Sequence, residues 1–301
     1  MIRAALLATL LFAGCASTGH WQNDVEHASA LARDQQHDLV VYFALPGREA
    51  SDRMQQSLQD PLVLDALHDG GFFAAMADGA ARSDLRESLI GYGEGMGIAV
   101  LDGKGRVYAA RPGPQEPAEL AAFLRLCVDA RAGLRSMRDR TDPITAPMDQ
   151  HWLGCQFLQL GCRKEAEPLL LDAAKAGVTD AKHRLARLYA LEGDVTRARQ
   201  WLAAAPRTPA AQVTEGYVLF KERRHREAVN VLEAALQTGD LGDERQRALL
   251  YLGKALHEDR QDERALPLLQ ALAAEGTGST FEAAAAHTLG HLRDPQHGHA
   301  H

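Results

Sequence analysis

The stretch 39–54, LVVYFALPGREASDRM, is the first place in the sequence where side chains could do chemistry. Its apolar first half predicts a buried strand, and Pro46 and Gly47 predict a turn before a polar helix. Folds often place reactive or anion-binding groups at such a helix start. Arg48 and Ser51 lie at this helix start, but the Ser51 hydroxyl has no obvious base within the motif. The stretch therefore has the form of an active site without its reactive atoms, and we assign no catalytic residue.

Cysteine thiols are the next candidates. Cys127 falls in line with the apolar face of a predicted helix, which indicates a packed, unreactive thiol. Cys155 and Cys162 are seven residues apart. On one continuous helix their Cα atoms would be about 10.5 Å apart, beyond the roughly 7 Å limit for a disulfide. We expect these thiols to be unpaired, and a redox use of Cys155 or Cys162 remains an alternative.

Histidines gather at the C-terminus of the chain: these are His287, His291, His297, His299 and His301. Alternating imidazoles can bind Zn²⁺, Ni²⁺ or Cu²⁺. A short tract of this kind is more often a flexible end. We therefore interpret 293–301 as a His-rich tail and predict neither a metal site nor a cofactor.

Length and composition bound the class of protein. The chain has 301 residues, of which 46% are hydrophobic and 24% charged, which is ordinary for a soluble globular protein of about two domains. Its formal charge of −7 provides no surplus of Lys and Arg to neutralise phosphates. This balance argues against a nucleic-acid partner.

The N-terminus has the form of a secretory signal over 1–14, because a basic residue precedes an apolar run too short to span a membrane. The run ends in FAGC at 12–15, which resembles the bacterial lipoprotein box, where the cysteine is acylated. The resemblance implies a palmitate anchor at Cys15, with 15–20 as a tether. Ala16 after the cysteine implies the periplasmic face of the outer membrane in a Gram-negative cell envelope.

Residues 21–131 predict an α/β domain in the order helix, strand, two helices, strand, helix, hairpin and helix, the last helix ending near Arg131. This order resembles the thioredoxin fold, especially periplasmic members whose strand ends in a Trp-Cys-x-x-Cys-Lys turn. Matched without gaps, the two family cysteines fall on Arg48 and Ser51, and the family's cis-proline falls on Met96. The resemblance implies a thioredoxin-like domain without its redox motif. We expect Ser51 to face solvent.

A change in composition marks 132–147 as a linker, and the sequence then repeats itself across 148–292. Each repeat has a small residue, a large one three later, an alanine twelve later and a leucine sixteen later. The small residues are Gly154, Ala186, Gly216 and Gly253. We expect each to let a second helix approach closely, at that helix's alanine. The pattern resembles tetratricopeptide repeats, and 173–189 also resemble a Sel1-like repeat.

The expected fold class is α/β plus all-α: a thioredoxin-like domain followed by an α-solenoid of about four tetratricopeptide-like helix pairs, with 281–292 as a capping helix. In such repeats the first helix of each pair lines the concave surface, which implies a peptide-binding groove. The candidate groove residues are His183, Arg184, Arg187, Tyr217, Tyr251 and Lys254. They could hold an acidic or extended peptide, or they could form an ordinary solvated helix face.

These features favour a cell-envelope lipoprotein that acts as a non-catalytic protein-interaction scaffold. Its partners would be an envelope protein or peptide in the groove, and the membrane through the lipid on Cys15. The alternative is a periplasmic thiol-disulfide helper or redox enzyme that uses Cys155 or Cys162.

Overall fold

A five-stranded mixed sheet lies at the centre of the first part of the chain. The computed structural model describes residues 20–90, 95–238, 241–242 and 244–293. The strands are β1 (Trp21–Gln22), β2 (Leu39–Ala44), β3 (Phe73–Asp78), β4 (Gly97–Leu101) and β5 (Val107–Pro112). Their order is β1-β3-β2-β4-β5; β3 is parallel to β1 and β2, and β4 is antiparallel to β2 and β5. Strand β2 is thus central, as its unbroken apolar run predicts.

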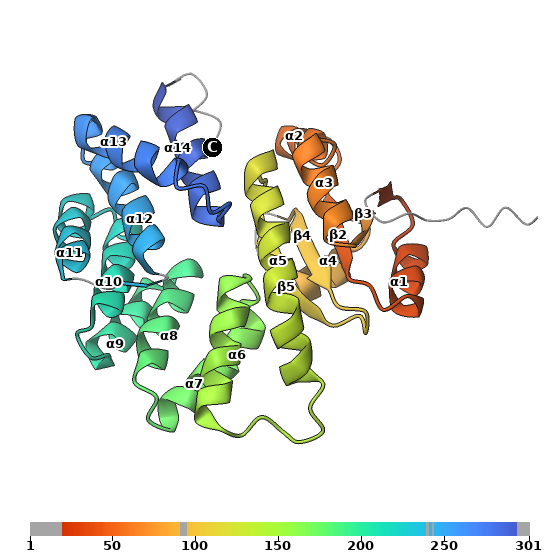
Figure 1. The fold of residues 1–301 in the computed structure, drawn as a ribbon, viewed down its shortest axis with the longest axis horizontal. Helices are drawn as coiled ribbons and strands as arrows, with labels where there is room; N and C mark the ends of the chain where they lie inside the picture. The colour runs from red at the N-terminus through yellow and green to blue at the C-terminus, as the bar shows by residue number, and fades with distance from the viewer. Residues whose placement is uncertain (1–19, 91–94, 239–240, 243, 294–301) are drawn as a thin grey trace, which may run out of the picture.

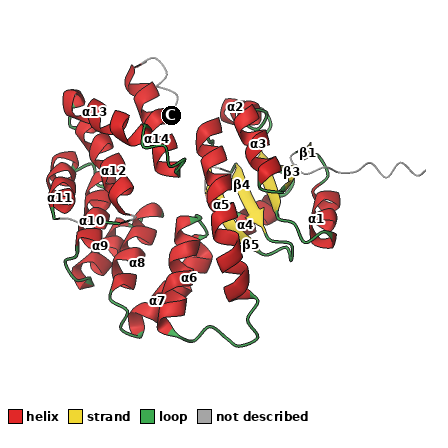
Figure 2. Ribbon diagram, viewed as in Figure 1, coloured by secondary structure: helices red, strands yellow, loops and turns green. Residues whose placement is uncertain are grey.

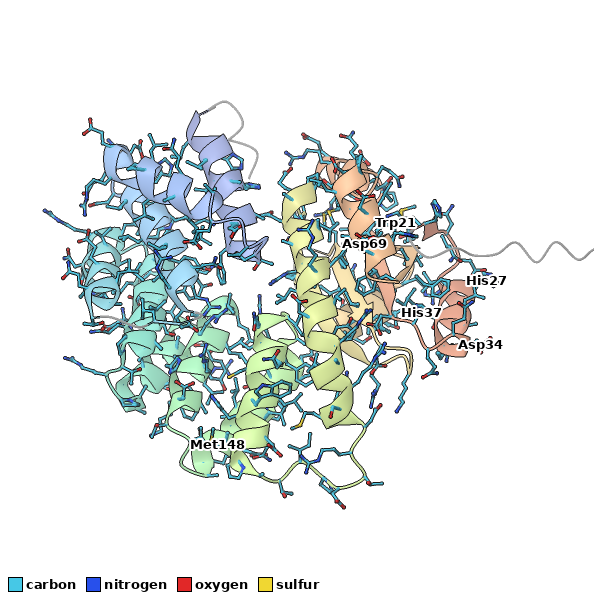
Figure 3. The ribbon with its side chains drawn as sticks, in the orientation of Figure 1. Trp21, His27, Asp34, His37, Asp69 and Met148 are labelled. Atoms are coloured by element: carbon cyan, nitrogen blue, oxygen red, sulfur yellow. The ribbon has the colours of Figure 1, made fainter. Side chains whose placement is uncertain are left out.

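Helices cover both faces of the sheet. On one face lie α1 (Val25–Asp34) and α4 (Ser83–Leu89), and on the other α2 (Glu49–Ser57), α3 (Pro61–Asp69) and α5 (Pro117–Arg138). Successive β2 side chains alternate between these two layers, and all of them are buried. Figure 2 shows the strands confined to this part of the molecule. His27 and Asp34 on α1 lie on the side facing away from the remaining helices (Figure 3).

The expected order of elements in this part is confirmed, with two differences. Strand β1 was not predicted, because two residues are too short to show a pattern. Helix α5 continues to Arg138 instead of ending near Arg131. Its last turns are held by other elements: Arg135 pairs with the buried Asp38 at 2.5 Å, and Arg138 donates to the Val107 carbonyl at 3.0 Å.

The second part of the chain consists of helix pairs and a final helix. The helices are α6 (Pro147–Gln159), α7 (Arg163–Lys175), α8 (Asp180–Leu191), α9 (Val195–Ala204), α10 (Pro209–Lys221), α11 (His225–Gln237), α12 (Glu244–Glu258), α13 (Asp262–Ala273) and α14 (Thr280–Arg293). In Figure 1, α6, α8 and α12 lie toward the α/β part, whereas α11 and α13 lie on the far side. Among the described residues, no helix is both long and apolar enough to cross a membrane.

In three of the four repeats the small residue is a glycine, and close packing inside the helix pair requires it. A Cβ atom on Gly154, Gly216 or Gly253 would lie 2.8, 2.4 or 2.6 Å from a side-chain carbon of the leucine sixteen residues later. We expected the alanine of the second helix at this contact, which is wrong. The leucine occupies it because its longer side chain reaches across to the backbone of the first helix.

One hydrophobic core joins the two parts. It extends from Val40 and Tyr42 in the sheet, through Cys127 of α5, to Phe157 and Cys162 at the first helix pair. Such a continuous core fixes the helix pairs against the sheet and α5.

The exposed edge of the sheet is covered by the first turn between helices. The Ala110 amide of β5 donates to the Leu160 carbonyl at 2.9 Å. Gly161 has φ +85°, and a Cβ atom there would lie 2.1 Å from the Ala110 oxygen, so only glycine permits this approach. The hydrogen bond uses an edge group that would otherwise need water or another chain.

The helix pairs contact α5 at both of its ends. Near its C-terminal end, Gly133 lies against Trp152 of α6. Near its N-terminal end, Glu119 lies 3.7 Å from His287 of α14. The two parts therefore meet at both ends of the array (Figure 1).

Substitution of the repeat glycines tests this packing. Gly216→Ala is expected to destabilise the protein by about 1–3 kcal/mol, because the new methyl group overlaps Leu232. Gly290→Ala in α14 is the matched control, since nothing lies within 4 Å of its Cβ position. This control should gain about 0.5–1 kcal/mol from helix propensity alone. Denaturant unfolding measures both, and equal gains in the two variants would contradict the packing.

Candidate functional site

The position of the lost redox motif is a structural element of the fold. Arg48 is the exposed N-cap of α2 and makes no side-chain capping bond. We expected Ser51 to face solvent, and this is wrong: Ser51 is buried, because it shares one helix face with Met54, which packs on the sheet. Its hydroxyl accepts from the Leu45 amide at 3.0 Å and lies 2.9 Å from the Tyr42 hydroxyl. Met96, at the position of the cis-proline, is also buried.

The three cysteines that the structure describes are free thiols; Cys127 and Cys162 are buried, and Cys155 is partly exposed. Burial raises the pKa of Cys127 and of Cys162 far above the ordinary value, so neither forms a thiolate near neutral pH. The Cys155 sulfur lies 3.8 Å from His151 Nδ1 and 3.7 Å from Nε2. Because it is equally far from both nitrogens, it lies off the lone-pair direction of either. This arrangement does not match a nucleophile and its base.

A chain of charged groups runs along the inner faces of α6, α8 and α12. His151 Nε2 lies 3.1 Å from Asp180 Oδ2, and His183 Nδ1 lies 3.2 Å from Asp180 Oδ1. Arg184 approaches Asp180 at 3.5 Å and also pairs with Glu244. Glu244 pairs in turn with Arg247 on its own helix. Helices that belong to different repeats are thus linked by ion pairs.

The environment fixes the protonation state of these groups. The hydrogen bond to Asp180, and after it the nearby Cys155 sulfur, raise the pKa of His151 to about 9. Burial, followed by repulsion from Arg184, lowers the pKa of His183 to about 4. Burial alone would raise the pKa of Asp180, but the hydrogen bond from His151 and nearby positive charges hold it at about 2. Near neutral pH, His151 is charged and His183 is neutral.

The six predicted groove residues do not form one open surface. His183 and Tyr217 are buried, which corrects the expectation that they face a peptide. Tyr217 stacks on Tyr251 with ring centroids 4.6 Å apart. Arg184 is committed to the ion pairs, whereas Arg187 and Tyr251 face a cavity. Lys254 is half-buried.

That cavity lies between the two parts of the chain. It has a volume of about 330 Å³, and its walls come from β5, α5, α6, α7, α8, α12 and α14. An adjoining cavity of about 580 Å³ shares Gln159, Thr280 and Phe281 with it and is lined on its far side by residues of α3 and α5. The concave face of the repeats is therefore covered by the sheet and α5, instead of being an open groove.

Several charged residues that line this cavity were not predicted from the sequence. Arg111, Arg163 and Arg247 join the predicted Arg187 and Tyr251 in the cavity wall. A signal existed for Arg111, which interrupts a strand whose neighbouring residues are apolar. Arg247 lies one helical turn beyond the inner-face positions considered, and Arg163 belongs to a second helix. Only the packing of the two parts brings these residues together.

The predicted His-rich tail lies outside the described residues from 294 onward. His287 and His291 lie on α14 with their Nε2 atoms 2.5 Å apart. Within the described part of the chain, no group of three or more His, Cys, Asp or Glu side chains is placed to hold a metal ion.

The His151 pair predicts a dependence of stability on pH. Because its pKa is raised from 6.5 to about 9, its contribution is complete below pH 6.5 and is lost as the pH rises through 9. Between about pH 6 and about pH 9.5, the wild type should therefore lose up to about 3 kcal/mol more of its unfolding free energy than His151→Gln loses. Equal losses in the two proteins would show that the pair contributes nothing.

Comparison with known proteins identifies the repeats. The family model for the tetratricopeptide repeat matches residues 213–280, which confirms the predicted repeat type over α10 to α13. The chain thus combines an N-terminal α/β region with a many-helix array of tetratricopeptide type, a class of repeat that generally presents surfaces to protein partners. No curated protein matches the sequence.

One solved structure with repeats of this type is a distant neighbour. It contains the nearly identical TPR-like repeats of a putative kinesin light chain from Podosopora anserina. It is 22% identical in sequence to the present chain, with a TM-score of 0.33. The match covers 52% of the present chain and 86% of that one. This similarity is too low to support any inference about the architecture or the function.

Proposed function

We propose that this chain is a cell-envelope lipoprotein that acts as a non-catalytic protein-interaction scaffold. The observation that carries the proposal is the inner face of the helix pairs, where Arg187 and Tyr251 line a cavity that a partner segment could enter, and the half-buried Lys254 lies on the same helix as Tyr251. The signal-like N-terminus and Cys15, both outside the described residues, support anchoring at the periplasmic face of the outer membrane.

The first part of the chain is, in this proposal, a thioredoxin-like module that has lost redox chemistry. The element order and the central position of β2 support the relationship. Arg48 at the helix start is no nucleophile, and the Ser51 hydroxyl is occupied by Leu45 and Tyr42. The role of this module is instead to cover the inner face of the repeats through β5 and α5, which limits the size of a partner segment that can reach that face.

The two adjoining cavities differ in charge, and this difference would orient a partner segment bound across them. The cavity of about 330 Å³ carries arginines from several elements, whereas the cavity of about 580 Å³ carries three aspartates and one arginine: Asp65, Asp69, Asp129 and Arg125. An extended segment that places acidic groups toward Arg187 and basic groups toward these aspartates would match both charges. This pattern favours a partner of mixed charge over a uniformly acidic one.

The redox alternative now depends on Cys155 alone, since Cys127 and Cys162 are buried. The purified chain is expected to catalyse no thiol-disulfide exchange, because the sulfur and imidazole of Cys155 and His151 are not aligned. Exchange activity that disappeared in Cys155→Ser but persisted in Cys162→Ser would restore the alternative.

In-cell photocrosslinking tests the scaffold. Photoreactive residues at positions 187 and 254 should each capture the same protein partner, because Arg187 lines the inner-face cavity and Lys254 lies on the same helix as Tyr251 of that cavity wall. Position 226, where the exposed Arg226 lies on the outer helix α11, is the matched control. The control should capture less of that partner.

A second arm of the same experiment tests the anchor. Cys15→Ser should leave the membrane fraction and lose palmitate labelling, and capture of an outer-membrane partner should fall with it. Equal capture at positions 187, 254 and 226 would argue against a binding role for the inner face. Retention of label in Cys15→Ser would argue against the lipoprotein assignment.

A further inference from the structure

The cavity of about 330 Å³ between the two parts carries an excess of positive charge. Its charged lining residues are Arg111, Arg163, Arg187, Arg247 and Glu119, a net charge of +3. The arginines come from β5, α7, α8 and α12, so no single helix explains their convergence. Glu119 provides little compensation, because its carboxylate also faces His287 and the first turn of α5.

Two of these guanidinium groups lack a polar partner. Arg111 stacks over the Phe123 ring at 4.8 Å, but it makes no hydrogen bond or ion pair with any residue that the structure describes. The same is true of Arg187. Arg163 donates only to the Leu191 carbonyl, at 3.1 Å, and Arg247 is paired with Glu244. Donors of the first two residues are therefore available to a ligand.

Burying unpaired charges of the same sign is costly, because each loses hydration and repels the others. Burial, followed by repulsion from Arg247, lowers the pKa of Arg187 to about 9. Burial also lowers the pKa of Arg111, and repulsion from Arg163 adds to this effect. Neither guanidinium group is thus neutralised by a side chain that the structure describes, and an anion would stabilise the charged form of both.

We infer that this cavity is a binding site for a compact oxyanion with two or more negative charges, held between the two parts of the chain. Guanidinium groups pair with carboxylate, phosphate or sulfate oxygens through parallel N–H donors, and Arg111 on β5 and Arg187 on α8 both supply such donors to the lining of this cavity. Gln115, Thr280 and Tyr251 add neutral polar groups to the lining. The site does not depend on the scaffold role.

The size of the cavity limits the ligand. About 330 Å³ is at the lower end of the range for small-molecule pockets, so the site suits a small anion such as a phosphate or a short polycarboxylate. The ligand would also join β5 to α8 and α12, and binding should therefore raise the stability of the assembled chain.

The experiment uses the full chain with inorganic phosphate and with citrate as probes, titrated by calorimetry against chloride of matched ionic strength. At least one probe should bind at a single saturable site with a Kd below about 1 mM and raise the thermal midpoint. Saturation by phosphate alone identifies a phosphate-type site, and saturation by citrate alone a carboxylate-type site. Saturation by neither probe overturns the inference.

Variants locate the site. Arg111→Gln and Arg187→Gln should each weaken binding by about tenfold or more, since each removes one charged donor. Arg226→Gln, an exposed arginine on α11, is the control and should bind as the wild type does. In chloride, Arg187→Gln should be at least as stable as the wild type, because it removes an unpaired buried charge. Undiminished binding in both cavity variants would place the anion elsewhere and overturn the inference.

Discussion

The contact between the edge of the sheet and the first inter-helix turn is the constraint on which the rest of the structure depends. The Ala110 amide binds the Leu160 carbonyl, and Gly161 allows the two backbones to approach. This contact and the shared core around Cys127, Phe157 and Cys162 set the direction in which the helix pairs leave α5. The array then curves so that α14 returns to the other end of α5. The concave face consequently looks onto the chain's own sheet and α5.

Because that face is covered, its charged residues interact more strongly than they would in water. On an open solenoid, Arg184, Arg187 and Glu244 would be screened by water and contribute little energy. Here Glu244 is buried between Arg184 and Arg247, and positive charge around it holds its pKa at about 2 although burial alone would raise it. Arg187 faces the cavity and has no such partner among the residues that the structure describes. The same closure therefore creates both the ion-pair chain and the unbalanced positive charge.

Local patterns in the sequence predicted most helices and strands, but they did not predict which distant residues come into contact. The apolar run of β2 and the spacing of Gly154, Gly216 and Gly253 led to the sheet layer and the helix pairs. Of the cavity residues, Arg187 and Tyr251 were predicted because they share a helix face, whereas Arg111 was missed. Ser51 was misplaced because solvent exposure was inferred from polarity, although its spacing from Met54 put it on the packed face. How the two parts meet has no local signature.

The central claim is that the α/β part and the helix pairs form one folded unit around the shared core. Tryptophan fluorescence can follow the unfolding of each part separately. Trp21 lies on β1 of the α/β part and donates to the Leu58 carbonyl, and Trp201 lies on α9 of the helix pairs. Two variants that each retain one of these tryptophans, the others replaced by Phe, should unfold in denaturant at the same midpoint. Coincident fluorescence transitions indicate one cooperative unit. A transition of Trp21 clearly separated from that of Trp201 would contradict the account.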